Sequence, residues 1–124
     1  MPASKSVIEL TKVAALAAAQ KFGTEIVAID LSDQLVLSEV FLIVTGANVR
    51  QVDAIADEVE EKLRLIGEKP ARREGGDEWI LLDYSDLVVH IQSSDLRKYY
   101  MLDRLWNDCP TIALDLPKED PSHA

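Results

Sequence analysis

Apolar residues recur every three or four positions in several stretches of the chain, which is the period of an amphipathic helix. The first predicted helix begins at Ser6, because Ser6 and Glu9 have the spacing of a capping box, and Gly23 is its predicted stop. The second predicted helix is capped by Asn48 and ends at Gly67. One face of this helix is apolar, and the rest is strongly acidic, which is typical of a solvated surface.

A third helix is predicted after Ser94, which can cap it, and before Pro110, which cannot continue it. Its apolar stripe consists of Leu96, Tyr99, Leu102, Leu105 and Trp106.

Strands are predicted where apolar or β-prone runs lie between turn residues. These runs cover residues 25–30, 41–45, 70–74, 78–83 and 87–92, and residues 111–114 are predicted to add an edge strand. The run at 41–45 is apolar almost throughout, which favours a central strand buried on both faces. Gly75-Gly76 is a predicted turn, and the short Tyr84-Ser85-Asp86 connection predicts an antiparallel hairpin.

The resulting order is α-β-β-α-β-β-β-α, which predicts an α+β (α/β-like) single domain. We expect one mixed central sheet of about five strands with the helices packed on it. The strand after the second helix is expected to run parallel to its predecessor through a right-handed crossover. Residues 1–116 form the predicted domain, and residues 117–124 form a flexible acidic tail.

Charge narrows the classes of partner. The chain has 13 Lys and Arg residues against 22 Asp and Glu residues, for a net charge of -9, so little direct nucleic-acid binding is expected. A basic protein is the more suitable partner for such a chain. The single cysteine, Cys109, cannot form an internal disulfide, and neither a secretory signal nor a membrane span is recognised, so a cytoplasmic location is expected.

Catalytic chemistry finds little support in the residue pattern. The only histidines are His90, which is predicted to lie within a strand as a structural or interface residue, and His123. A catalytic base remains the alternative for His90, although no nucleophile turn accompanies it. Asp83 and Asp86 flank a turn, where they either bond turn amides or bind magnesium. No catalytic residue, metal site or cofactor is predicted.

Aromatic residues gather in the second half of the chain, namely Trp79, Tyr84, Tyr99, Tyr100 and Trp106. One strand or helix face cannot bury all of them. They either complete the core or form an exposed patch of the kind that marks protein–protein sites.

Three segments carry a resemblance to a known family. Residues 78–91 resemble a W-x-L-x-D-x-G-D-x-V-V-H pattern, residues 97–106 an R-x-x-Y-x-L-x-x-L-W pattern, and residues 45–52 a T-G-x-S-x-R-Q-V pattern. Taken in their order along the chain, the three segments resemble the RsfS/Iojap family of ribosome-silencing factors over about residues 6 to 107. Ser85 stands where the family usually has glycine, so positive φ at this turn would strain the backbone.

The resemblance implies a non-enzymatic protein that binds the large ribosomal subunit through its L-fourteen protein. Bound there, it would block the small subunit and repress translation under nutrient limitation. It also implies a homodimer in the free state and a fold similar to a nucleotidyltransferase core without the catalytic metal motif. The alanine-rich first helix is expected to pack closely against the sheet or a second subunit. The predicted docking residues are Trp79, Leu81, Asp83, Tyr84, Asp86, Arg97 and Tyr100.

Two alternatives remain at this stage. One is a nucleotidyltransferase-like enzyme that uses Asp83 and Asp86 with magnesium. The other is an assembly factor of the large subunit, which would bind the same particle.

Overall fold

The computed structural model describes residues 4–33, 38–100, 108–114 and 116 of the chain. The elements are α1 (Lys5–Gln20), β1 (Thr24–Asp30), β2 (Val40–Gly46), α2 (Val49–Leu65), β3 (Arg72–Gly76), β4 (Trp79–Asp83), β5 (Leu87–Ser93) and α3 (Ser94–Tyr100). This order confirms the predicted succession of helices and strands. None of the helices in the described part of the chain is long and apolar enough to cross a membrane.

The five strands form one mixed sheet in the order β1-β2-β5-β4-β3. The predicted hairpin is confirmed, because β4 and β5 pair antiparallel from Trp79↔Gln92 to Asp83↔Val88. The strand that pairs parallel with β2 is β5, whereas β3, the strand after α2, lies at the far edge. The reason is composition, since β5 is buried along its whole length and β3 is polar and exposed.

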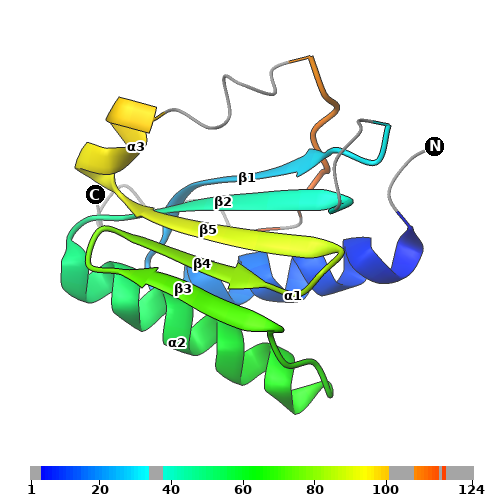
Figure 1. The fold of residues 1–124 in the computed structure, drawn as a ribbon, viewed down its shortest axis with the longest axis horizontal. Helices are drawn as coiled ribbons and strands as arrows, with labels where there is room; N and C mark the ends of the chain where they lie inside the picture. The colour runs from blue at the N-terminus through cyan, green and yellow to red at the C-terminus, as the bar shows by residue number, and fades with distance from the viewer. Residues whose placement is uncertain (1–3, 34–37, 101–107, 115, 117–124) are drawn as a thin grey trace.

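Both long helices cover the same face of the sheet (Figure 1). One hydrophobic cluster joins α1, α2 and alternate residues of the strands, including Leu42, Val89 and Leu82. Four alanines of α1 are buried in this cluster, namely Ala14, Ala15, Ala17 and Ala18, so this face of the helix packs within its own chain. A smaller cluster around Ile29, Ile43 and Cys109 lies apart from it.

The start of α1 differs from the prediction. The helix begins at Lys5, with Ser4 at the cap position, so the expected Ser6–Glu9 capping box is wrong. The Ser4 side chain makes no cap bond, and the Ser4 backbone amide donates to Oε1 of Glu39 at 2.7 Å. A distant carboxylate therefore holds the start of this helix in place.

The end of α1 also differs, because the left-handed residue is Phe22, with φ of 64°, and not Gly23. Gly23 is needed for space. A Cβ atom there would lie 2.8 Å from Cγ1 of Val44 and 2.9 Å from the carbonyl oxygen of Ala18.

The ends of α2 match the prediction. The Asn48 side chain accepts from the Gln51 amide at 2.9 Å, and Gly67 follows the helix with φ of +88°. The amides of Gly67 and Glu68 donate to the carbonyls of Arg64 and Leu63, which is the Schellman pattern.

The cap of α3 and the end of the chain need two corrections. The cap residue is Ser93, one position earlier than predicted, because its Oγ accepts from the Leu96 amide at 3.1 Å. The predicted edge strand at 111–114 is reduced to one antiparallel bridge between Ile29 and Thr111. Residues 101–107 and 117–124, which include much of the predicted third helix and the predicted tail, lie outside the described residues.

The turn predicted at Gly75-Gly76 is displaced by two residues. Both glycines end β3, and Asp77 and Glu78 form the turn. Gly75 has φ of +85°, and a Cβ atom there would lie 2.1 Å from the carbonyl oxygen of Trp79. Only glycine fits this approach to β4.

The turn between β4 and β5 has the strain expected at Ser85. Its φ is 72°, and its amide donates to Oδ1 of Asp83 at 2.8 Å. The Tyr84 amide closes the turn by donating to the carbonyl of Leu87 at 2.8 Å. The turn thus keeps its hydrogen bonds at the cost of a left-handed serine.

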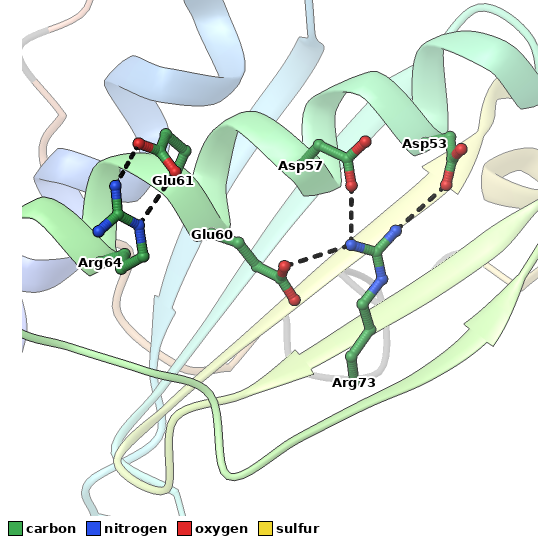
Figure 2. Close-up of polar contacts among 6 residues, drawn as sticks. All are labelled: Asp53, Asp57, Glu60, Glu61, Arg64 and Arg73. Carbon is green, nitrogen blue, oxygen red and sulfur yellow. Dashed lines mark hydrogen bonds and ion pairs between the residues drawn. The ribbon is translucent and has the colours of Figure 1, made fainter.

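The exposed edge strand is tied to α2 by one arginine. Nη2 of Arg73 lies 3.1 Å from Oδ1 of Asp53, and Nη1 of Arg73 lies 2.9 Å from Oδ1 of Asp57 and 3.4 Å from Oε2 of Glu60 (Figure 2). Burial lowers the pKa of Arg73, but the hydrogen bond that Arg73 donates to Asp57 and the three negative charges outweigh burial and raise it. The basic residue of this edge strand thus forms ion pairs with the acidic face of α2.

Removing the arginine that ties β3 to α2 should loosen the sheet edge. We expect Arg73→Ala to lower the free energy of unfolding by about 1 kcal/mol and to speed amide hydrogen exchange in β3. Arg64→Ala is the matched control, because the described partner of Arg64 is Glu61 on its own helix, and a smaller loss is expected. Equal losses in urea denaturation, with unchanged exchange in β3, would contradict the role of Arg73.

Relieving the strained turn should stabilise the chain. We expect Ser85→Gly to raise the free energy of unfolding by about 0.5 kcal/mol, because glycine adopts positive φ without steric cost. Ser38→Gly is the control, since Ser38 is not among the described residues with positive φ and its replacement should destabilise slightly. Thermal melting of both variants checks the sign.

Candidate functional site

The face of the sheet opposite α1 and α2 carries the candidate site. Successive residues of a strand point to opposite faces, so the neighbours of the helix-side core residues point the other way. We call this the outer face, defined by Phe41, Trp79, Leu81, Asp83, Val88 and His90. Of the described helices, only the short α3 lies on this side, at the end of β5 (Figure 1).

Three rings form a row across β4, β5 and β2. The ring centroids of Phe41 and His90 lie 4.7 Å apart in an edge-to-face arrangement. The rings of Trp79 and His90 lie 6.0 Å apart, and the indole Nε1–H of Trp79 donates to Nδ1 of His90 at 3.2 Å. These contacts hold the row in one geometry.

His90 is neutral in this row. It is 6% exposed, and burial lowers its pKa to about 4. Because Nδ1 accepts from Trp79, the proton lies on Nε2, which has no hydrogen-bond partner among the described residues. The buried amide of Gln92, two residues along the same strand, is also unpartnered there. Two buried polar groups without a described hydrogen-bond partner on one face of a strand cost folding free energy, and protein cores usually avoid them.

A hollow of about 500 Å³ lies at the Phe41 end of the row. Its apolar floor is made by Phe41, Leu81, Val88 and His90. Its polar wall is made by Ser38, Arg72, Asp83 and Ser85. The hollow is thus bounded by β2, β3, β4, β5 and the turn before β5.

The polar wall is internally satisfied. Arg72 donates to Oδ2 of Asp83 at 3.0 Å and to Oε1 of Glu74 at 2.9 Å, and the Ser85 amide donates to the other oxygen of Asp83. The hydrogen bond that Arg72 donates to Asp83 and the negative charge of Glu74 raise the pKa of Arg72. Asp83 is therefore paired within the wall, whereas Asp86 is exposed on the adjoining turn.

The structure separates the predicted docking residues. Trp79, Leu81 and Asp83 are half-buried on the outer face, and Asp86 is exposed on the adjoining turn. Tyr84 is 8% exposed and lies in the helix-side cluster, where burial raises its pKa, so its ring is not on the outer face. The side chain of Tyr100 lies outside the described residues.

Arg97 has a structural position instead of a surface one. It is 5% exposed, and its Nη1 donates to the carbonyl of Glu25 and to Oγ1 of Thr45, each at 2.8 Å. These bonds join α3 to β1 and β2. Arg97 is therefore a positioning residue, and a partner could not reach its guanidinium without displacing α3.

Sequence reasoning missed Phe41, Val88 and Arg72 as parts of the site. The first two lie in runs that are apolar on both faces, so alternation could not show which residues face away from the helices. Arg72 becomes visible only through its register, opposite Asp83.

The magnesium alternative finds no cluster to support it. Asp83 is bonded to Arg72 and to the turn. Within the described ranges, no group of three or more His, Cys, Asp or Glu side chains is placed to hold a metal ion.

The sequence matches a family model described as "Ribosomal silencing factor during starvation" over residues 4–124. A ribosomal silencing factor RsfS from Bacillus subtilis is 38% identical over 108 residues, which is 86% of this chain and 92% of the relative. The chloroplastic protein Iojap of Zea mays is 37% identical over 79 residues, which is 60% of this chain and 33% of that protein.

Solved structures share the fold. A crystal structure of a Chromobacterium violaceum protein superposes with a TM-score of 0.77 at 31% identity, covering 92% of this chain and 96% of that one. A Bacillus halodurans protein gives a TM-score of 0.74 at 34% identity, covering 90% of this chain and all of that one. The single domain, with helices on a five-stranded mixed sheet, matches these structures.

The buried His90 should make stability depend on pH. Its native pKa of about 4 lies below the ordinary value of 6.5, so unfolding takes up a proton between these values. The contribution of neutral His90 is complete above pH 6.5 and is lost as pH falls toward about 4, a loss of about 3 kcal/mol.

Urea unfolding at several pH values checks this expectation. His90→Asn keeps an acceptor for the Trp79 indole but does not titrate, so its stability should fall less steeply than that of the wild type between pH 7 and pH 4. Parallel profiles for the two proteins would show that His90 does not titrate as a buried neutral group.

Proposed function

Because this chain belongs to the ribosomal silencing factor (RsfS) family, we propose that it binds the large ribosomal subunit through its L-fourteen protein. Bound there, it sterically blocks association with the small subunit and so represses translation under nutrient limitation. The family is one of non-enzymatic regulators, so the magnesium-dependent alternative is set aside.

The observation that carries the docking surface is the outer face. It presents a half-buried Trp79 and Leu81 beside a formed hollow, on a sheet whose opposite face is filled by two helices. Rigid aromatic residues around a hollow are typical of the residues that dominate binding energy at interfaces. Nε2 of His90 and the side-chain amide of Gln92 are buried and have no hydrogen-bond partner in the described part of the chain. This departs from ordinary core packing, and such departures are concentrated at functional sites.

Charge supports a basic protein as the partner. The chain carries a net charge of -9, which opposes contact with phosphate and favours encounter with a positive protein surface. Asp86 is exposed and follows Ser85, which lines the hollow, so we expect its carboxylate to attract such a surface. Its contribution should lie in the association rate and its salt dependence.

Occlusion needs no chemistry at the bound surface. A standard interface buries about 800 Å² on each partner. A domain of 124 residues bound at a subunit interface leaves the bulk of its volume where the other subunit would pack. The proposed mechanism therefore depends on affinity and position alone.

We further propose a homodimer for the free protein, as the family resemblance implies. The alanine face of α1 does not support it as the dimer contact, because these alanines are already buried against their own chain. Any dimer would use another surface.

Changing the outer face should abolish binding to the large subunit. We expect Trp79→Ala combined with Asp86→Lys to weaken co-sedimentation with purified large subunits by at least about a hundredfold, because an aromatic anchor and a favourable charge are both lost. Phe22→Ala with Glu9→Lys is the matched control. It removes an exposed aromatic ring and reverses an exposed acid away from the outer face, and it should bind like the wild type.

The same samples test silencing. Wild-type protein and the control should reduce the fraction of assembled ribosomes when small subunits are added, and the outer-face variant should not. Binding of the wild type without any effect on subunit joining would favour the assembly-factor alternative. Unchanged binding of the outer-face variant would contradict the docking surface.

A further inference from the structure

We propose that the hollow on the outer face is an anchor pocket for one bulky, uncharged side chain of the partner protein, next to a Lys or Arg that pairs with Asp86. This inference rests on the proposed function, because it names the chemistry by which the partner is recognised. The hollow provides the affinity, and Asp86 on the adjoining turn provides the electrostatic attraction.

We expect an uncharged occupant because the described lining of the hollow is largely apolar. The floor consists of Phe41, Leu81, Val88 and a neutral His90. The two charged residues of the wall are paired with each other, since Arg72 donates to Asp83 at 3.0 Å, and Arg72 also pairs with the exposed Glu74. A charged side chain placed on this floor would lose its water without a direct ionic partner there, which is strongly unfavourable.

The occupant must be bulky because the hollow is large. Its volume of about 500 Å³ lies within the range of pockets that hold whole small ligands, so a bulky side chain would fill part of it and a small one very little. An aromatic or long aliphatic side chain would cover Phe41, Leu81 and Val88 together. Such a residue, packed in a desolvated pocket, is the usual hot spot of an interface.

The pocket is formed before any partner arrives. The indole of Trp79 holds His90, the ring of Phe41 packs on His90, and Glu74 and Asp83 hold Arg72 from two sides. Binding therefore costs little ordering of this chain, which leaves more of the contact energy for affinity.

The neighbouring basic residue follows from Asp86. The backbone of this turn is fixed, because the Asp86 carbonyl accepts from the amides of Glu39 and Val40 at 2.9 and 3.0 Å. The Asp86 side chain is exposed, and no ion pair is recorded for it among the described residues. It follows Ser85, which lines the hollow, so we infer that a cation beside the anchor would pair with it.

Filling the hollow tests the anchor. Val88→Trp should occupy the space that the partner needs and weaken binding to purified large subunits about tenfold or more. Val49→Trp is the matched control, because Val49 is exposed on α2 at the opposite layer, and it should bind within about twofold of the wild type. Thermal melts show whether each variant is folded, and Ser38→Trp, which fills the hollow from its wall, replaces Val88→Trp if that variant does not fold.

Salt dependence separates the two parts of the proposal. The loss caused by Val88→Trp should be the same at low and high salt, whereas the loss caused by Asp86→Lys should shrink as salt rises. If the filled variants bind like the wild type, the anchor pocket is wrong while wild-type binding still supports the proposed function. If the wild type itself does not bind large subunits, the proposed function fails, and this inference fails with it.

Discussion

Burial of β5 on both faces is the constraint on which the rest of the structure depends. All seven of its residues are buried, and it pairs parallel with β2 on one side and antiparallel with β4 on the other. A strand of this composition is stable only at the centre of a sheet with material on both faces. The helices α1 and α2 supply one covering layer, whereas among the described residues no long helix lies on the other face.

This one-sided packing explains the outer face. Phe41, Trp79 and His90 shield the centre of the sheet by packing on one another, and the row they form is rigid and only partly covered. The same residues thus complete the fold and present a surface. A protein partner that covered the row would extend the burial that the helices provide on the opposite face.

Charged residues divide between structure and surface in a way that their sequence positions do not reveal. Arg73 ties the edge strand to α2, Arg97 ties α3 to β1 and β2, and Arg72 pairs with both Asp83 and Glu74. Asp86, on the turn that adjoins the hollow wall, is exposed. The large negative charge of the chain therefore overstates how many carboxylates are available to a partner at this site.

The sequence by itself determined the element order, the β4–β5 hairpin, the cap at Asn48 and the family, because periodicity, capping spacing and motif order are local properties. It misplaced the cap of α1, where Glu39 comes from a distant part of the chain, and the turn after β3, where Gly75 lies against the carbonyl of Trp79 on the paired strand. It also placed Tyr84 and Arg97 at the surface. Only the tertiary structure decided these positions, together with the hollow and the partnering of Asp83. Each of these features depends on strand register and on which face of the sheet the helices cover. These two properties are not encoded within a short window of residues.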